Sequence, residues 1–376
     1  MKFKDKTIII ISQQDWGKMF ISKHHYASVL AGMGNTVYFM NGPEKGDSLR
    51  KGQVKIEASG TENLYVVRHR LFYPYLLKFK VPALHVFLLK FHLRKIYKTI
   101  SRPIDIVWSF DVSDTIHLNA FPNNSLKIFM PVDNPVNPGQ EKRADVMFSV
   151  TREILDMYRC DTPKMFVNHG VADYFINSEI RIERNVPAQV GISGNFLRPD
   201  IDWECLLQIV TSHTDVVFHF WGAFEMKDGN LSADTHPAAQ LYKGKLAILP
   251  NVILHGAVDV HTLAGELKKM DAFLICYDIG KDQSKGTNYH KVLEYLAAGK
   301  VIVSNNITTY QGTGLIEMPG ERNNDNLPVV FADVIKHLDI HNSADKQKER
   351  IAYAAAHTYR NNIKAIETFI SQHVPA

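Results

Sequence analysis

The chain has 376 residues, which exceeds one ordinary hydrophobic core and favours two domains. Its formal net charge of +4 is too small to indicate a nucleic-acid-binding protein. The three cysteines, Cys160, Cys205 and Cys276, match no metal-binding spacing and fit a reducing cytosol. No apolar run approaches the roughly 20 residues of a membrane span. We therefore expect a cytoplasmic protein that is soluble or peripheral at the inner face of the plasma membrane.

The first half of the sequence alternates strands with helical segments. The apolar run at 7–11 predicts a buried parallel strand, 21–33 a helix and 36–40 a second strand, which together form a βαβ unit. The loop after the first strand carries no G-x-G-x-x-G pattern, so we expect no dinucleotide site there. Further strands are predicted at 63–68, 105–110, 126–130, 146–150 and 164–167.

A second α/β series follows a polar segment at 181–187. Strands are predicted at 189–193, 216–221, 252–255 and 272–277, and helices at 202–211, 261–270 and, at the C-terminus, 346–372. The sequence therefore predicts an α/β protein of two tandem Rossmann-like domains, with ligands bound in the cleft between them.

The segment 287–304 carries the strongest functional pattern, because it predicts a loop, a helix, a tight stop and a strand. Thr287 or Asn288 is expected to cap the helix, and Gly299 is expected to end it in a left-handed conformation. A helix N-terminus is a natural anion site, and the positive charge of Lys291 adds to it. Glu294, one turn further, can accept hydrogen bonds from neutral hydroxyl groups.

A diphosphate at the helix start and a ribose at the glutamate describe a nucleoside diphosphate. The competing interpretation is an ordinary amphipathic helix with a surface Lys–Glu pair. Other turns of the second half are expected to contribute to donor binding: a small-residue turn after the strand at 189–193, a turn after 252–255, and the loop before the helix. Their candidate residues are Gly194, Asn195, Arg198, Ala257, Val258 and Lys285. Each of these turns is otherwise a plain connection.

The run Asp200-Ile201-Asp202 has the letters of a metal–diphosphate motif, D-x-D. It follows a proline and opens a predicted helix, so we expect helix capping and no metal there.

Polar residues also gather around the first loop and helix of the N-terminal half, and we expect them to face an acceptor. They are Gln13, Asp15, Trp16, Lys23, His24 and His25. The adjacent histidines point about 100° apart on a helix and would chelate a metal poorly. Asp133, just past a predicted strand end, is either a catalytic carboxylate or a turn former.

The segment between Asn63 and Ile104 contains no acidic residue. Basic charge mixed with aromatic residues suits an anionic membrane interface, so we expect residues 70–102 to contact one. A core helix with a solvated basic face is the alternative, and nucleic acid ranks third because no known module is visible. The basic residues are Arg68, Arg70, Lys78, Lys80, Lys90, Arg94, Lys95, Lys98 and Arg102.

Several of these runs resemble the donor half of a group 1, family 4-like glycosyltransferase. The most specific is 290–300, His-Lys-Val-Leu-Glu-Tyr-Leu-Ala-Ala-Gly-Lys, and 251–256 and 267–277 add to it. The stretch 168–175 resembles that family's inter-domain segment. Asp15-Trp16 and Lys23-His24-His25 resemble its acceptor loop.

The resemblance implies a GT-B fold of two Rossmann-like domains. We place them at 1–183 and 186–357, with a C-terminal helix at about 358–376 crossing back to the first. It also implies retaining transfer from a nucleotide sugar, without an essential metal or a cofactor. Glu294 would bind the ribose, Lys291 and Arg198 the diphosphate, and the Ala257–Val258 backbone the base. The catalytic candidates are Asp133, Arg198 and Lys291.

The sequence departs from the family pattern at several positions. Gly286 stands where the family often has a glutamate, eight residues before Glu294. Asn195 and Asp200 replace the family's usual arginine and lysine. Asp133 is the nearest counterpart of a family histidine.

The expected function is transfer of a sugar to a glycan, plausibly lipid-linked, in surface polysaccharide assembly. A sugar-nucleotide epimerase of the same fold and a non-catalytic partner in a glycan assembly complex remain as alternatives.

Overall fold

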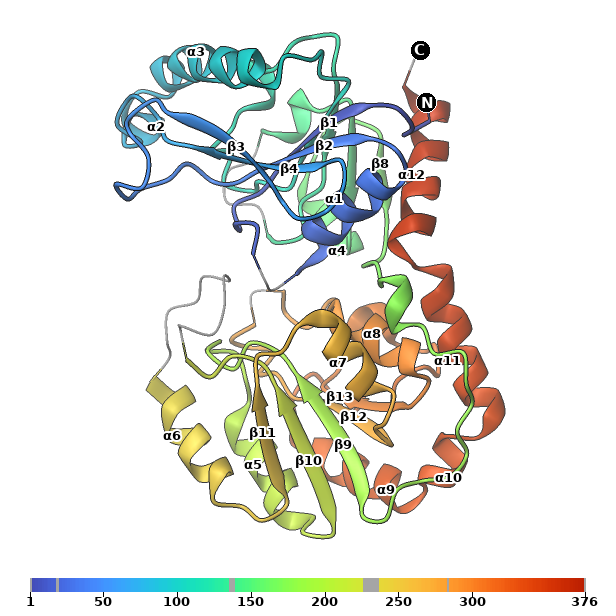
Figure 1. Ribbon diagram of the computed structural model, residues 1–376. Helices are drawn as coiled ribbons and strands as arrows, with labels where there is room; N and C mark the ends of the chain where they lie inside the picture. The colour runs from blue at the N-terminus through green and yellow to red at the C-terminus, as the bar shows by residue number, and fades with distance from the viewer. Residues whose placement is uncertain (1, 18–19, 135–138, 226–236, 283, 375–376) are drawn as a thin grey trace. The chain divides into compact units, whose positions relative to one another are not determined.

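The structure is a computed structural model that describes residues 2–17, 20–134, 139–225, 237–282 and 284–374. The chain divides into two compact units (Figure 1). The N-terminal unit extends to Asn168 and is completed by the residues from Tyr359 onward, while the C-terminal unit runs from His169 to Thr358.

The N-terminal unit contains an eight-stranded sheet in the order β3-β4-β2-β1-β5-β6-β7-β8. All neighbouring strands pair in parallel except β3 and β4. The strands β2, β3 and β4 lie on one side of β1 in the sheet. The strands from β5 onward lie on its other side. The bounds are β1 Thr7–Ile11, β2 Thr36–Met40, β3 Val54–Ala58, β4 Leu64–His69, β5 Ile106–Ser109, β6 Leu126–Phe129, β7 Val146–Ser149 and β8 Lys164–Phe166.

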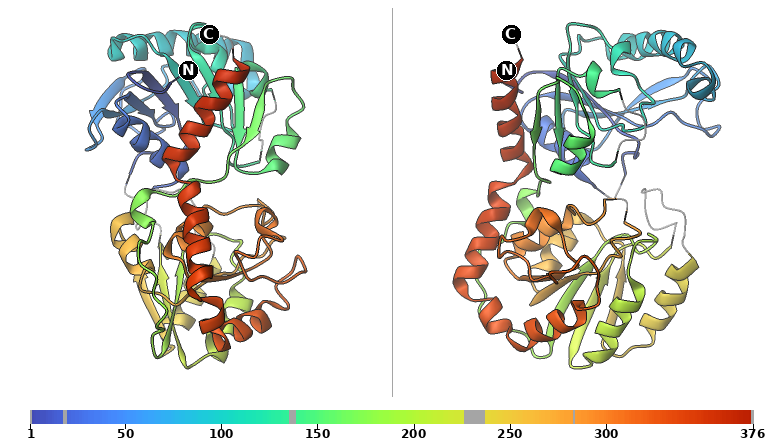
Figure 2. Two further views of the ribbon diagram at one scale, coloured as in Figure 1. Left: turned by 90° about the vertical axis from the view of Figure 1, so that its right-hand side faces the viewer. Right: turned by 180° about the vertical axis from the view of Figure 1, so that it is seen from behind.

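Helices cover both faces of this sheet, which is why β1 is buried at every position and apolar from Ile8 to Ile11. Ile8 and Ile10 pack in the layer of α1 and α12, whereas Ile9 and Ile11 pack in the layer of α3. The helices are α1 Ser22–Gly32, α2 Leu77–Lys80, α3 Pro82–Ile100, α4 Arg152–Met157 and α12 Tyr359–His373, with short 3-10 helices at Leu118–Ala120 and Glu141–Arg143. Figure 2 shows α3 along the periphery of this unit.

The C-terminal unit contains a five-stranded parallel sheet in the order β11-β10-β9-β12-β13. Its strands are β9 Ala188–Ser193, β10 Val216–Trp221, β11 Val252–Gly256, β12 Ala272–Ile275 and β13 Val301–Ser304. Its helices are α5 Trp203–Ser212, α6 Pro237–Ala247, α7 Val260–Leu267, α8 Lys291–Ala298, α9 Leu327–Lys336, α10 Leu338–His341 and α11 Ala344–Ala356, with 3-10 helices at Asp173–Phe175 and Thr308–Tyr310. The mixed α/β architecture confirms the expected fold class.

Three expectations about elements need correction. The predicted helix at 346–372 is two helices, α11 and α12, because α11 packs on α8 whereas α12 packs on α1 in the other unit. The segment 169–183, expected in the first domain, belongs to the C-terminal unit. Arg181 there forms an ion pair with Asp271 at 3.0 Å. The strand β3 and the helices α2, α4, α6, α9 and α10 were not predicted.

Two expectations about helix ends are confirmed. The Asp202 carboxylate caps α5 by accepting a hydrogen bond from the Cys205 N–H group at 3.1 Å. Gly299 ends α8 in the left-handed conformation, with a φ of +83°. Among the described residues, none of the helices combines the length and the apolar character that a membrane crossing requires.

Candidate functional site

The chain order of the C-terminal sheet reverses between β9 and β12, and open α/β sheets bind ligands outside the strand ends at such a point. Glycines occupy the carboxyl ends of three adjacent strands there: Gly194 after β9, Gly222 after β10 and Gly256 at the end of β11. The Gly222 N–H group donates to the Gly256 carbonyl at 2.8 Å. A Cβ atom at Gly222 would lie 1.6 Å from the Gly194 carbonyl oxygen, so only glycine fits. At these three positions, the edge of the sheet therefore has main-chain atoms and no side chains.

The ammonium group of Lys291 lies against the first of these turns. Its Nζ atom donates to the Ser193 carbonyl oxygen and to the Tyr277 hydroxyl oxygen, the latter at 2.6 Å. A Cβ atom at Gly194 would lie 2.6 Å from this Nζ atom. The lysine side chain is only 7% exposed. A fixed positive charge thus sits at the reversal point, beside the backbone of the turn after β9.

Helix α8 starts at Lys291, with His290 at the N-cap position. The expectation that Thr287 or Asn288 caps it is wrong, since the loop before the helix is organised around another residue. The buried Asp282 carboxylate accepts hydrogen bonds from the Ser284 and Tyr289 hydroxyl groups and from the Gly286 N–H group. Burial opposes ionisation of Asp282, but these hydrogen bonds outweigh it and lower its pKa.

Gly286, where the resembling family often has a glutamate, is a structural turn residue in this chain. Its φ of +65° is in the left-handed region, and a Cβ atom would lie 3.0 Å from the Asn306 carbonyl oxygen. The position therefore serves the geometry of the loop, and a side chain there would strain it.

Glu294 lies one helical turn after Lys291, with its side chain 13% exposed. Burial raises its pKa to about 7, although the charge of Lys291 works in the opposite direction. The Nε2 atom of His290 is 3.9 Å from the Oε1 atom of Glu294. A glutamate held near half-ionisation at neutral pH gains from hydroxyl donors that stabilise its charged form. This arrangement suits the binding of a diol.

The pKa of Glu294 leads to a prediction about stability. The unfolded value is 4.5, so the folded state binds more protons between pH 4.5 and 7 and loses stability as the pH rises through that window. Glu294→Gln is expected to stabilise the ligand-free C-terminal unit by up to about 3 kcal/mol at pH 8 and to have little effect below pH 4.5. Thermal unfolding of both proteins across this range measures it. Equal unfolding temperatures at pH 8 would contradict the prediction.

Arg198 is close to Lys291 but is already paired. Its Nε atom donates to the Asp200 carboxylate at 2.8 Å, and its Nη2 atom is 3.4 Å from the Asp282 Oδ1 atom. Although burial works against it, these carboxylates raise the pKa of the guanidinium further. The guanidinium carbon of Arg198 lies 5.5 Å from the ring centre of Tyr277. The Lys291 ammonium group also lies over the Tyr277 ring. Two aspartates therefore offset the charge expected to act on a diphosphate.

The other donor-side candidates lie in turns. The Asn195 side-chain oxygen accepts a hydrogen bond from the Leu197 N–H group at 3.1 Å. Ala257 and Val258 connect β11 to α7, whose N-cap is Asp259. The remaining candidates are Lys285, which is exposed with a φ of +49°, Thr287, whose carbonyl accepts from the Thr309 hydroxyl, and Asn288, which is buried. Among the predicted donor-site residues, the structure brings Gly194 into contact with the Lys291 side chain.

A second polar cluster occupies the reversal point of the N-terminal sheet, between β1 and β5. Gln13, after β1, donates from Nε2 to the Asp111 carboxylate at 2.5 Å. Lys23 is 2% exposed, and burial lowers its pKa to about 8 against the opposing charges of Asp133 and Asp111. Gln13, Lys23 and Asp133 therefore share this edge of the sheet with Asp111.

The histidines expected to face an acceptor are in the interior of the N-terminal unit. Burial lowers the pKa of His24 to about 4; its Nδ1 atom accepts from the Ile21 N–H group, and its Nε2–H group donates to the Asp15 carbonyl. His25 stacks on Tyr359, with ring centres 4.8 Å apart. The ring of Trp16 contacts His24 and Phe39. These ring contacts fix Trp16 against α1 and β2, and Asp15 beside it is exposed.

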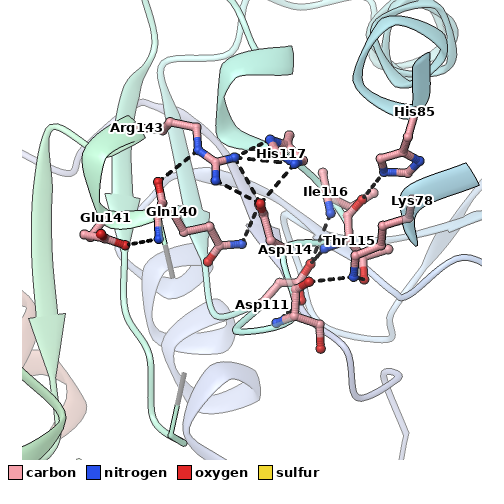
Figure 3. A network of polar contacts seen from close by, with 12 residues as sticks. Lys78, His85, Asp111, Asp114, Thr115, Ile116, His117, Gln140, Glu141 and Arg143 are labelled. Carbon is pink, nitrogen blue, oxygen red and sulfur yellow. Dashed lines mark hydrogen bonds and ion pairs between the residues drawn. The ribbon is translucent and has the colours of Figure 1, made fainter. Parts of the chain in front are cut away.

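Sequence reasoning missed Asp111, Tyr277 and Gly222. The Asp111 carboxylate accepts the N–H groups of Thr115 and Ile116, and Figure 3 shows it beside the ion pair of Asp114 and Arg143. The available signal was position, because Asp111 and Gly222 directly follow predicted strands and Tyr277 is the last residue of one.

One group of side chains in the described part of the chain has the composition of a metal site. Ligand atoms of Asp202, Cys205 and Cys276 lie within 4.8 Å of one another. The Asp202 carboxylate already caps α5. A hydrogen bond with Cys205 and burial raise the pKa of the Cys276 thiol, so it stays protonated. These contacts explain the cluster without a metal ligand role.

No family model matches this sequence, and no curated protein matches it. Solved structures match over nearly the whole chain. Sucrose-phosphate synthase from Thermosynechococcus elongatus is 10% identical, covers 98% of each chain and has a TM-score of 0.67. The lipopolysaccharide outer core galactosyltransferase WaaB is 15% identical, covers 98% of this chain and 99% of its own, and has a TM-score of 0.60.

HepE from Anabaena, in a complex with UDP and glucose, is 10% identical with a TM-score of 0.61, over 97% of this chain and 99% of its own. The chain has the GT-B glycosyltransferase fold. In the C-terminal unit of this GT-B chain, Lys291 and Glu294 are on the helix that leaves the reversal point of the sheet. The expected fold is thereby confirmed.

Proposed function

We propose that this GT-B protein is a glycosyltransferase that uses a nucleotide sugar as its donor. The observation that carries the proposal is the position of the Lys291 ammonium on the Gly194 turn, with Glu294 one helical turn away. Both groups lie at the point where parallel sheets bind ligands. The similarity in fold to a protein named as a lipopolysaccharide galactosyltransferase supports it.

The proposed chemistry follows from charge. In transfer from a nucleoside diphosphate sugar, the bond from the sugar to the diphosphate breaks, and negative charge develops on the departing diphosphate. Lys291, which lies at the positive end of the α8 helix dipole, would stabilise that charge. Glu294 would hold the ribose, which fixes the donor relative to Lys291. We expect this transfer to be retaining and to need no metal, with Lys291 in the charge-neutralising role.

The N-terminal unit would supply the acceptor side. Gln13, Lys23, Asp111 and Asp133 gather at its own sheet reversal point, where carboxylates and amides can hold sugar hydroxyls. We infer that the acceptor is a lipid-linked glycan of surface polysaccharide assembly.

Two observations favour a second candidate. Gly286 removes a side chain that the resembling family often uses, and Arg198 is neutralised by two aspartates. A non-catalytic partner in a glycan assembly complex would bind a nucleotide without turning it over.

The test is calorimetric titration with UDP, GDP, ADP and CMP, first without metal and then with magnesium, followed by turnover assays on the matching nucleotide sugars. A glycosyltransferase binds one diphosphate without metal and releases it from its sugar. Binding without release supports the non-catalytic partner, and an isomerised sugar formed without acceptor supports an epimerase. Absence of any nucleotide binding would overturn the proposal.

A further inference from the structure

Exposed apolar side chains gather on one part of the N-terminal unit. Of the 17 large apolar side chains that are exposed in the described part of the chain, eight fall within residues 72–91. They are Phe72, Tyr75, Leu76, Phe79, Val81, Leu84, Phe87 and Phe91, and we call them the aromatic face. Scattered exposed apolar residues are normal on soluble proteins, whereas a contiguous group marks an interaction surface.

Helix α3 shows why this surface is not part of the core. Its buried side, which includes Leu89, Leu93 and Ile96, already packs on the sheet. The opposite side carries Phe87 and Phe91, whose ring centres are 5.0 Å apart. At helical spacing of three to four residues, the same stripe continues into exposed basic side chains, which include Arg94 and Lys98. A second apolar side on a packed helix has no role in folding the unit.

The aromatic face is held in a fixed position by buried polar contacts (Figure 3). Lys78 of α2 donates from Nζ to the Ser113 carbonyl at 2.5 Å and to the Thr115 hydroxyl at 3.3 Å. His85 of α3 lies 3.2 Å from the Thr115 carbonyl through Nε2, and its Nδ1 atom lies 3.1 Å from the Tyr73 hydroxyl oxygen. Both helices are thus fastened to one loop, so binding through their exposed side loses little conformational entropy.

The positive charge of this region indicates an anionic partner. No acidic residue occurs between Asn63 and Ile104, and the exposed basic residues Lys80, Lys90 and Arg94 flank the rings. The Arg94 guanidinium carbon lies 5.0 Å from the ring centre of Phe91. Protein–protein interfaces are depleted in lysine, whereas aromatic side chains surrounded by unopposed cations suit an anionic lipid interface.

We propose that the aromatic face and the basic residues of α3 bind an anionic phospholipid surface. The rings enter the boundary between headgroups and acyl chains, and the cations contact the phosphates. This surface deepens the proposed function, because it would bring the acceptor side of the enzyme to a lipid-borne glycan. That consequence rests on the proposed function, but lipid binding itself does not depend on donor chemistry.

The experiment is co-sedimentation of the full chain with vesicles of phosphatidylcholine alone and with vesicles of phosphatidylcholine mixed with phosphatidylglycerol, at low and high salt. The wild type is expected to bind the mixed vesicles at low salt and to lose binding at high salt. Phe87→Ser with Phe91→Ser is expected to weaken binding by about tenfold or more. Lys90→Glu with Arg94→Glu is expected to remove the preference for phosphatidylglycerol.

The matched control is Val329→Ser with Ile340→Ser, which removes two exposed apolar side chains from α9 and α10 and is expected to leave vesicle binding unchanged. Thermal unfolding and nucleotide titration of each variant separate loss of lipid binding from loss of folding or of the donor site. Failure of the wild type to bind mixed vesicles, or wild-type binding by the Phe87→Ser, Phe91→Ser variant, would overturn the proposal. Binding of single-stranded oligonucleotides in place of vesicles would assign the surface to nucleic acid.

Discussion

Replacing Glu294 with alanine is expected to weaken metal-free binding of the nucleoside diphosphate by at least about 100-fold. In the proposed complex, the ionised carboxylate accepts hydrogen bonds from both ribose hydroxyls, and each hydrogen bond to a charged group contributes about 1.5–3 kcal/mol. The carboxylate is nearly buried, and burial raises its pKa to about 7. Water therefore solvates its charge poorly, and the two ribose hydroxyls would supply the missing hydrogen bonds. Calorimetric titration at pH 8 measures the change.

Two controls assign this loss to the ribose. Nucleotides lacking the 2′- or 3′-hydroxyl should bind the wild type more weakly but bind Glu294→Ala no more weakly than the full nucleotide. Glu266→Ala removes a partly exposed glutamate from α7 and should leave affinity unchanged. Because ionised Glu294 is the binding form, nucleotide binding to the wild type near pH 7 should also release protons. An equal effect of the missing hydroxyl in both proteins would rule out the ribose assignment.

Replacing Lys291 with methionine is expected to lower the turnover number by about 10²–10³-fold, the usual loss when one preorganised charge-stabilising donor is removed. The ammonium is positioned on the Gly194 turn, and methionine keeps a similar length without the charge. Steady-state kinetics with the donor identified by titration measures the effect. Gly194→Ala should act in the same direction, because its Cβ atom would displace the Nζ atom.

The loss must be separated from instability, since Lys291 also satisfies the Ser193 carbonyl and the Tyr277 hydroxyl. Tyr277→Phe removes the second partner and keeps the charge, so it should retain most of the turnover. Lys281→Met changes an exposed lysine in the preceding loop and serves as the matched control. Unchanged turnover in a folded Lys291→Met protein would show that the lysine only holds the turn together.

The strands could be predicted because parallel strands covered on both faces are apolar along most of their length. The predictions at 7–11, 36–40 and 216–221 match β1, β2 and β10 residue for residue. The start of α8 could not be predicted, because Asp282 organises the preceding loop through contacts that local capping preferences do not reveal. The sequence pattern of a helix such as α3 also does not distinguish apolar residues that pack in the core from apolar residues that stay exposed, such as Phe87 and Phe91.

In the candidate site, the sequence likewise indicated individual residues but not the contacts between them. Sequence reasoning chose Lys291 and Gly194 separately, but their contact follows from the strand order, which only the fold supplies. His24 appeared as a polar candidate, whereas its two ring nitrogens bond to backbone groups of its own loop. The neutralisation of Arg198 by Asp282 likewise joins positions far apart in the sequence.

Helix α12 has a consequence for the order in which the chain folds during synthesis. Its Ile363 and Ile366 side chains are fully buried in the same core as Ile8 and Ile10 of the first strand. Helix α12 must therefore be synthesised before the N-terminal unit can close this core, whereas the compact unit His169–Thr358 is synthesised earlier. The unit encoded second is expected to be the first to reach its native state, the reverse of the usual N-to-C order.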